Sequence, residues 1–114
     1  MILTGETKLD FERWLHSNDV LIKDGIYDDT YLTDVFDKLP LNFQNALIIE
    51  WFDSVGIFVS INYVDFYDEL RNNTGFETYV TNKGLSIKFR SVSSRQEAIK
   101  QAIKKANEIY NEKI

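Results

Sequence analysis

The chain has 114 residues, a formal net charge of −5 and no cysteine, with 44% hydrophobic and 14% aromatic residues. This length allows one hydrophobic core and not two ordinary domains, and the lack of thiols excludes disulfides, zinc fingers and iron–sulfur centres. No stretch approaches the roughly 20 apolar residues of a membrane span, and the N-terminus resembles no secretion signal, so we expect one cytoplasmic domain over residues 1–114.

Residues 1–39 are predicted to form an acidic helical segment. Apolar residues at helical spacing indicate a short helix over roughly 5–16 and a second helix that has Thr30 as its N-cap and includes Phe36. His16 is the single histidine and lies at the end of the first helix, where a cation complements the helix dipole. A place at a helix end explains this residue more simply than a catalytic triad does.

Residue 40 opens the second part of the chain, a predicted α-β-β-β-α unit over 40–114. Proline favours the first turn of a helix, and apolar residues continue at helical spacing, so we expect a helix over 41–54. Gly56 suits the position just after a helix, and the β-branched and aromatic residues that follow predict a first strand over 57–63.

Two more strands are predicted where apolar and polar residues alternate, over 76–81 and 85–91. Asn82, Lys83 and Gly84 lie between them and predict a three-residue turn with glycine in the left-handed conformation. The three strands together predict an antiparallel sheet.

The last helix has a clear start. Ser94-Arg95-Gln96-Glu97 has the form of a capping box, in which the Ser94 hydroxyl and the Glu97 carboxylate each accept from a backbone N–H, so we expect a helix over 95–111. Its apolar residues fall within an arc of about 160°, opposite polar residues that include Asn107 and Asn111. The predicted fold class is α+β, with the helices 41–54 and 95–111 on one face of the sheet.

The predicted core draws on both long helices and on the first and third strands. Its members are Trp51, either Phe58 or Ile61, Ile87, Phe89, Ala102, Ile103 and Ala106.

The sequence gives little support to catalytic or metal chemistry. Asp65, Asp68 and Glu69 could gather a magnesium ion, but a solvated acidic surface explains them as well. An EF-hand calcium loop is excluded because Val20 and Ile22, which have no side-chain oxygen, would occupy ligand positions. A glycine-rich phosphate-binding loop is excluded because the five glycines are spread along the chain. We therefore expect a protein that is not an enzyme and that has no metal and no cofactor.

The predicted α-β-β-β-α order resembles the double-stranded-RNA-binding domain over residues 40–114. The resemblance is topological, and it implies phosphate contacts from the start of the last helix, where Arg95 and Lys100 stand in this sequence. Two features depart from that family. Glu97 lies where the family concentrates positive charge, and residues 64–69 carry three carboxylates that would repel phosphate.

A second resemblance is to small, largely uncharacterised proteins encoded by phages and prophages of the Bacteroidota. It rests on the block Phe52-Asp53-Ser54-Val55-Gly56-Ile57, on Arg95-Gln96-Glu97-Ala98 and on the helix residues Ala102 to Asn111. It implies a phage accessory role in the host cytoplasm and assigns no site residue.

Charge is divided unevenly along the chain. Residues 1–70 carry 14 Asp and Glu against 4 Lys and Arg, whereas residues 71–114 carry 4 against 9. Such an asymmetry points to a charged partner, unless folding brings the two halves together.

Two functional hypotheses follow from this division. The first is a non-catalytic protein-binding module, such as a phage accessory protein or inhibitor, whose acidic and aromatic surface binds a basic host protein such as a nucleic-acid enzyme. Its predicted binding residues are Asp24, Tyr27, Asp28, Asp29, Tyr31, Asp65, Phe66, Tyr67, Asp68 and Glu69. The alternative is a nucleic-acid-binding domain that uses the basic half. Its predicted binding residues are Lys83, Lys88, Arg90, Arg95, Lys100 and Lys104.

Overall fold

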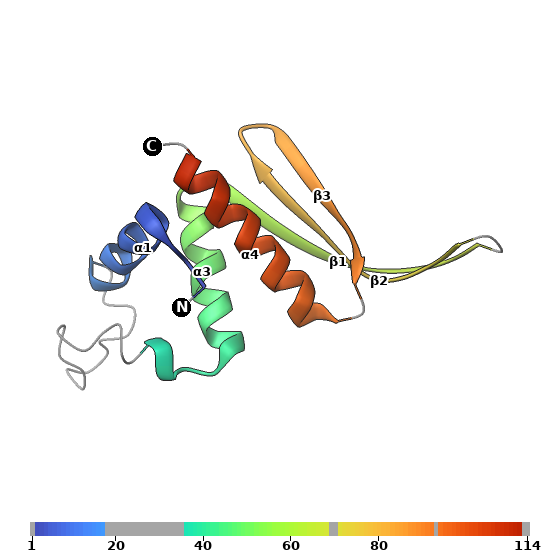
Figure 1. Ribbon diagram of the computed structural model, residues 1–114, viewed down its shortest axis with the longest axis horizontal. Coiled ribbons are helices and arrows are strands. Elements are labelled where there is room, and N and C mark those ends of the chain that lie inside the picture. The colour runs from blue at the N-terminus through green and yellow to red at the C-terminus, as the bar shows by residue number, and fades with distance from the viewer. Residues whose placement is uncertain (1, 18–35, 69–70, 93, 113–114) are drawn as a thin grey trace.

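The helices and strands follow the order that the sequence predicts, in one α+β domain (Figure 1). The structure is a computed structural model that describes residues 2–17, 36–68, 71–92 and 94–112, with side chains left out at 64–68, 71–74 and 90–92. Its longer elements are α1 (Gly5–Ser17), α3 (Leu41–Ser54), β1 (Ile57–Asp68), β2 (Arg71–Asn82), β3 (Leu85–Val92) and α4 (Arg95–Glu112). A further helical turn covers residues 36–38.

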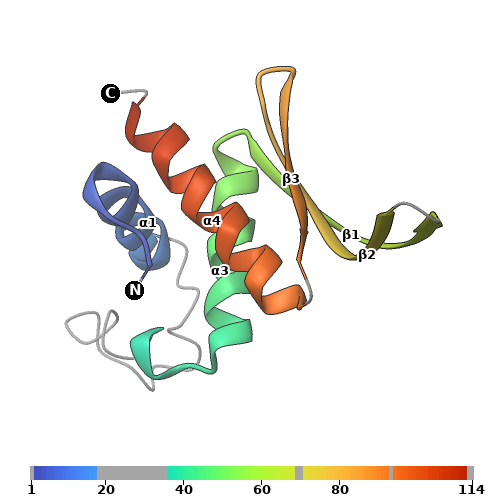
Figure 2. The ribbon, with the colours of Figure 1, turned by 45° about the vertical axis from the view of Figure 1, so that its right-hand side comes forward.

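The three strands form one antiparallel sheet in the order β1-β2-β3. Helices α3 and α4 cover one face of this sheet, and α1 packs on the far side of these helices, as Figures 1 and 2 both show. The predicted arrangement of the two long helices on one face is confirmed. The predicted start of the second N-terminal helix at Thr30 lies outside the described residues.

Local signals set most of the boundaries. The Ser94 hydroxyl accepts a hydrogen bond from the Glu97 backbone N–H at 3.1 Å and so caps α4 as predicted. Gly56 follows α3 with φ +84°. The hairpin turn is shorter than predicted, because Asn82 still pairs with Leu85. Only Lys83 and Gly84 remain in the turn, both with positive φ as a tight two-residue hairpin turn requires.

The strands β1 and β2 run further than the predicted ranges 57–63 and 76–81. Their pairing continues from Val64 opposite Gly75 to Asp68 opposite Arg71, whereas the last pair between β2 and β3 is Phe76 with Val92. Residues 64–68 and 71–75 therefore form a two-stranded ribbon beyond the third strand. We call this ribbon the arm, and Figure 1 shows it reaching away from the helices.

The core lies between the three helices and the inner face of the sheet. Phe11 of α1 packs against Phe36 and Trp51 with ring centroids 5.2 and 5.8 Å away, and Trp51 also contacts Tyr110 at 5.0 Å. The predicted core residues Trp51, Ala102, Ile103 and Ala106 are all buried. The small side chains of Ala102 and Ala106 let the backbone of α4 approach the sheet closely.

The core prediction was wrong for Ile87, which is 37% exposed. This residue lies opposite Val80 on the inner face of the sheet, but it lines a hollow of about 400 Å³ between β3 and α4. Of the alternatives in β1, Ile61 is half-buried and Phe58 is 53% exposed. Side chains alternate between the two faces of a strand, so residues three positions apart point to opposite faces.

Two asparagines of α4 hold the start of α1, although the sequence placed both on the solvent side of the helix. Asn107 is 8% exposed. Its side-chain oxygen accepts from the Thr4 backbone N–H at 3.0 Å, and its nitrogen donates to the Thr4 hydroxyl at 3.0 Å. The Asn111 oxygen accepts from the Thr7 backbone N–H at 3.0 Å and from the Thr7 hydroxyl at 2.7 Å. These asparagines supply the N-terminal cap of α1 from a distant part of the chain.

Gly5 is required by this capping arrangement. Its φ is +60°, and a Cβ atom built on it would lie 3.0 Å from the Asn111 side-chain oxygen. Any other residue would strain the backbone and press on the cap at the same time.

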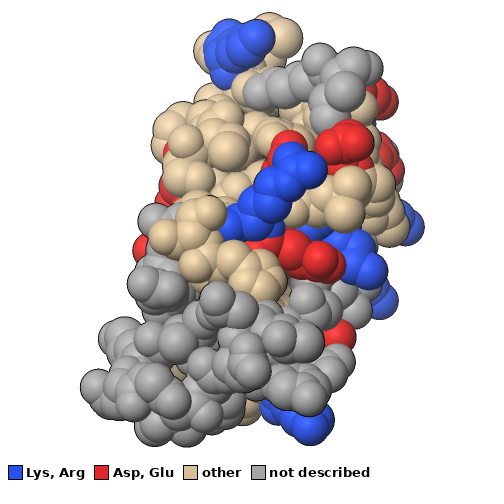
Figure 3. All heavy atoms as spheres, turned by 90° about the vertical axis from the view of Figure 1, so that its left-hand side faces the viewer, with Lys and Arg blue, Asp and Glu red and all other residues tan. Residues whose placement is uncertain are grey.

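The acidic and basic halves of the sequence are interleaved in the fold. Strand β1 of the acidic half pairs with β2 of the basic half, and α1 packs on α4. At the α1 end of the molecule, acidic and basic side chains of the described residues lie side by side (Figure 3). The division of charge along the chain therefore does not become a division of the whole surface.

Candidate functional site

The residues predicted to bind a protein partner fall into two groups. Asp24, Tyr27, Asp28, Asp29, Tyr31 and Glu69 lie outside the described residues. Asp65, Phe66, Tyr67 and Asp68 are placed by their backbone in β1, at consecutive positions of the arm. Their partners across the arm are Thr74, Asn73, Asn72 and Arg71.

The arm has a geometry suited to contact with another molecule. It is two strands wide over five residue pairs, a length of roughly 16 Å at the usual rise per residue. Beyond Phe76, β2 has no partner in β3. Both edges of the arm therefore offer backbone N–H and C=O groups, the groups through which an added strand pairs with a sheet.

We call the rest of the domain, with the helices and the three-stranded part of the sheet, the body. An aromatic and cationic cluster lies at the arm base, where the arm meets the body. Tyr63 and Phe76 are opposite each other in β1 and β2, with ring centroids 5.3 Å apart, and the Arg95 guanidinium lies 5.0 Å from the centre of the Phe76 ring. Tyr63 is 59% exposed. Aromatic residues and arginine are the types most often found at the energetic centre of protein interfaces.

The sequence hypotheses included Arg95 but missed Tyr63 and Phe76. A signal was present, because the strand prediction already placed one aromatic at the end of one strand and the other at the start of the next. What the sequence lacked was the register that sets the two rings opposite each other.

The residues of the nucleic-acid hypothesis do not share one environment. Lys88 lies on the outer face of the sheet, where its ammonium is 3.4 Å from the Glu77 carboxylate. Lys83 is in the hairpin turn. Lys100 lines a pocket between α3 and α4, and Lys104 lines the hollow beside β3. Arg90 is placed only by its backbone.

One titratable group in the body has a strongly altered acidity. The Tyr110 hydroxyl donates a hydrogen bond to the Asp10 carboxylate at 2.6 Å. Burial raises the pKa of Tyr110 to about 12, and the hydrogen bond to Asp10 and the charge of that carboxylate act in the same direction. This contact ties α1 to α4, so we assign it to the architecture of the body.

Metal binding and membrane insertion find no support in the described residues. Within the described parts of the chain, no three His, Asp or Glu side chains come together to hold a metal ion. The helices in those parts are also too short or too polar to cross a lipid bilayer.

Comparisons with protein-family profiles, curated proteins and solved structures each returned no match. We therefore infer the function from the geometry of this chain alone.

Proposed function

We propose that this protein is a non-catalytic binding module whose arm and arm base bind a basic protein partner. In the setting that the sequence suggests, it is a phage accessory protein or inhibitor, and the partner is a host protein such as a nucleic-acid enzyme. The observation that carries the proposal is the extension of β1 and β2 beyond β3. A two-stranded ribbon is only marginally stable by itself, and the body already has its own core, so contact with a partner gives this extension a purpose.

The composition of the arm supports a basic partner. Asp65 and Asp68 lie in the β1 strand of the arm, with Phe66 and Tyr67 between them, and Arg71 is the single basic residue in the two strands of the arm. Carboxylates guide a basic partner to the surface, and aromatic side chains then bury apolar area. The exposed Tyr63 and the Arg95 stacked on Phe76 extend this binding surface to the arm base.

The alternative is a nucleic-acid-binding domain, which one observation favours. Arg95 and Lys100 lie in the first two turns of α4, where the helix dipole also attracts phosphate. Against it, Lys88 is paired with Glu77, and the two aspartates of the arm would repel a phosphate backbone.

Charge reversal separates the two proposals. Asp65→Lys combined with Asp68→Lys should abolish capture of the partner from host lysate and slow its association, and rising salt should have the same effect on the wild type. The matched control is Lys100→Glu combined with Lys104→Glu, which should leave capture unchanged.

Gel-shift titration at low salt provides the opposing outcome. The wild type should not shift duplex RNA, duplex DNA or single strands. Tight nucleic-acid binding that weakens steeply with rising salt, and that is lost when Lys100 and Lys104 are both changed to glutamate, would favour the nucleic-acid alternative over the protein-binding module.

A further inference from the structure

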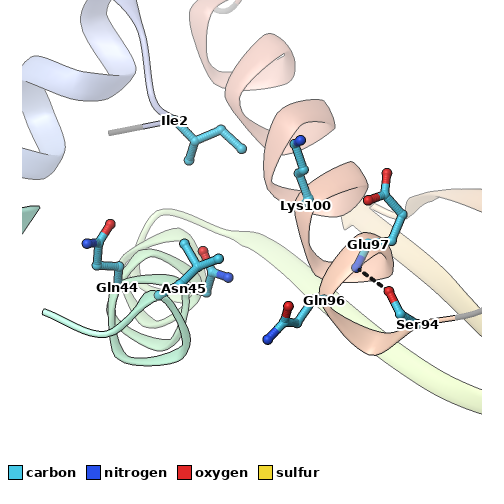
Figure 4. A pocket seen from close by; sticks show the side chains of 8 residues that line it. Ile2, Gln44, Asn45, Ser94, Gln96, Glu97 and Lys100 are labelled. Carbon is cyan, nitrogen blue, oxygen red and sulfur yellow. Dashed lines mark hydrogen bonds between the residues drawn. The ribbon is translucent and has the colours of Figure 1, made fainter.

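The pocket between α3 and α4 and the hollow between β3 and α4 differ in their linings. The pocket, of about 530 Å³, is lined mainly by polar side chains, among them Gln44, Gln96 and Lys100 (Figure 4). The hollow has Ile87 and Phe89 of β3 on one side and a rim of polar α4 residues on the other. Exposed apolar side chains are the more direct sign of an interaction surface.

The strand β3 forms a free edge of the sheet next to this hollow. The strand order is β1-β2-β3, so among the described residues no strand pairs with β3 on the side away from β2. Figure 1 shows β3 on the side of the sheet that is remote from α1 and α3. A free edge strand offers unpaired backbone N–H and C=O groups to another strand.

The inner face of the sheet is not fully covered at β3. Val80 and Thr78 of β2 are buried there. Ile87, opposite Val80, is 37% exposed, and Leu85, the next residue on the same face, is 76% exposed. Phe89, opposite Thr78, is half-buried. The apolar side chains of β3 therefore lie on the core side of the sheet at the point where the core ends.

The hairpin turn determines which residues of β3 present backbone groups to the free edge. In a two-residue turn the flanking residues, here Asn82 and Leu85, form a hydrogen-bonded pair, and such pairs recur at every second residue. The backbone groups of Leu85 and Ile87 therefore point to β2. Those of Ser86 and Lys88 point to the free edge.

We propose that β3 pairs with β3 of a second copy of this chain, antiparallel and about a two-fold axis at Ile87. The backbone groups of Ser86 then bond to those of Lys88 in the second copy, and Ile87 lies opposite its own counterpart. On the inner face, Leu85 lies opposite Phe89 of the second copy, so the apolar row continues across the axis. This pairing is independent of the role proposed for the arm.

Side-chain chemistry selects this register over its neighbours. An axis at Lys88 would set two ammonium groups opposite each other, which is unfavourable. An axis at Ser86 would leave Phe89 opposite Lys83 of the turn. Lys88 itself does not block the edge, because its ammonium lies 3.4 Å from the Glu77 carboxylate on the outer face of the sheet.

The charges around the hollow are compatible with a second copy. Its α4 side carries Lys104 and Lys105 together with Glu108, whose carboxylate lies 3.4 Å from the Lys105 ammonium. A rim of lysines alone would repel its own copy, whereas this rim holds both signs and matches a two-fold partner. An acidic segment, such as the arm of another molecule, would instead meet the carboxylate of Glu108.

Sedimentation equilibrium of the full chain tests this pairing. The contact is small, so we expect a monomer–dimer equilibrium with a Kd of roughly 1–100 μM. A chain that stays monomeric at about 1 mM would overturn the proposal. Assembly beyond the dimer would also overturn it, because a two-fold contact closes at two copies.

Disulfide cross-linking locates the axis, because the chain has no cysteine of its own. Ile87→Cys places two thiols opposite each other, with Cα atoms about 4.5 Å apart, which is within the range of a disulfide. Leu85→Cys is the matched control. Leu85 is more exposed than Ile87, but in this register its two copies are offset by roughly 13 Å along the strands.

Under mild oxidation, Ile87→Cys should form the covalent dimer about tenfold faster than Leu85→Cys, or more. Equal rates, or a faster rate for Leu85→Cys, would follow exposure and not strand pairing, and would overturn the proposal.

Charge variants test the same contact without a covalent bond. Ile87→Lys sets two cations on the axis and should raise the Kd of the dimer about tenfold or more. Phe58→Lys, on the outer face of β1, should leave the Kd unchanged, and equal effects of the two variants would contradict the pairing. If Ile87→Lys does not fold, the comparison of the two cysteine variants decides.

The variant with both Asp65→Lys and Asp68→Lys separates this contact from binding by the arm. It should form the dimer with the Kd of the wild type. Loss of the dimer in this variant would identify the arm as the segment that occupies the edge of β3, and would overturn the pairing of β3 with its own copy.

Discussion

The body and the arm share the strands β1 and β2 but differ in what lies beside those strands. In the body, the inner face of β1 and β2 meets α3 and α4, and Val80 and Ile57 are fully buried there. Beyond Phe76, the five residue pairs of the arm have no third strand beside them. The difference teaches that one hairpin can have a length that belongs to the core and a length that does not, and we propose binding for the second length only. The body then depends little on the arm, whereas the arm depends on the body to hold its base.

The largest expected effect comes from the aromatic cluster of the body. Phe11→Ala removes a fully buried ring that packs against Phe36 and Trp51, and it should lower the free energy of unfolding by about 3–5 kcal/mol. The same change at Phe58, which is 53% exposed on the outer face of the sheet, should cost much less. Urea denaturation of both variants provides the measurement, and equal losses would contradict the assignment of the core to the inner face.

A smaller loss should follow from overfilling the contact of α4 with the sheet. Ala102 is fully buried, so Ala102→Leu should cost about 1–3 kcal/mol of unfolding free energy. Ala46 is an exposed alanine in the middle of α3 and provides the same substitution without the crowding. Denaturation midpoints measure both. If Ala102→Leu matches Ala46→Leu, the close approach of α4 to the sheet is wrong.

The body could be predicted from the sequence where one periodic pattern determined the structure. The predicted helix 41–54 matches α3, and the predicted 95–111 differs from α4 by one residue at the end. The exception within α4 is the pair Asn107 and Asn111. Periodicity treats a polar side chain as solvent-facing, and it cannot show that a segment a hundred residues away will bring its free N–H groups there. Asparagine is a poor helix former, so two asparagines one turn apart were the available signal.

The arm could not be predicted, for a different physical reason. Residues 64–69 read as an acidic, aromatic loop, and Asn72, Asn73 and Gly75 are residue types that are depleted in strands. Pairing between β1 and β2 overrides these local preferences once the hairpin has started. The pocket between α3 and α4 could not be predicted from the sequence either, because its walls come from two helices and from Ile2, and only the fold brings them together.

The contact between Tyr110 and Asp10 should make the stability of the body depend on pH. The folded chain keeps the Tyr110 proton to about pH 12, whereas the unfolded chain loses it near pH 10.0. Its stabilising contribution is therefore complete below pH 10.0 and is lost as the pH rises toward 12. The stability difference between wild type and Tyr110→Phe, measured by urea denaturation, should shrink over this interval. A difference that is constant with pH would show that the proton is not held by the fold.

The central claim, that the body is stable without the arm, is tested most directly by removing the arm. In this variant, residues 65–74 are replaced by Asn-Gly, which closes a tight turn between Val64 and Gly75 where these residues already face each other. The measurement is the free energy of unfolding in urea. We expect the shortened chain to unfold in one transition, with a free energy within about 1 kcal/mol of the wild type. A loss of several kcal/mol, or loss of the cooperative transition, would show that the arm is part of the structural core and would contradict the account.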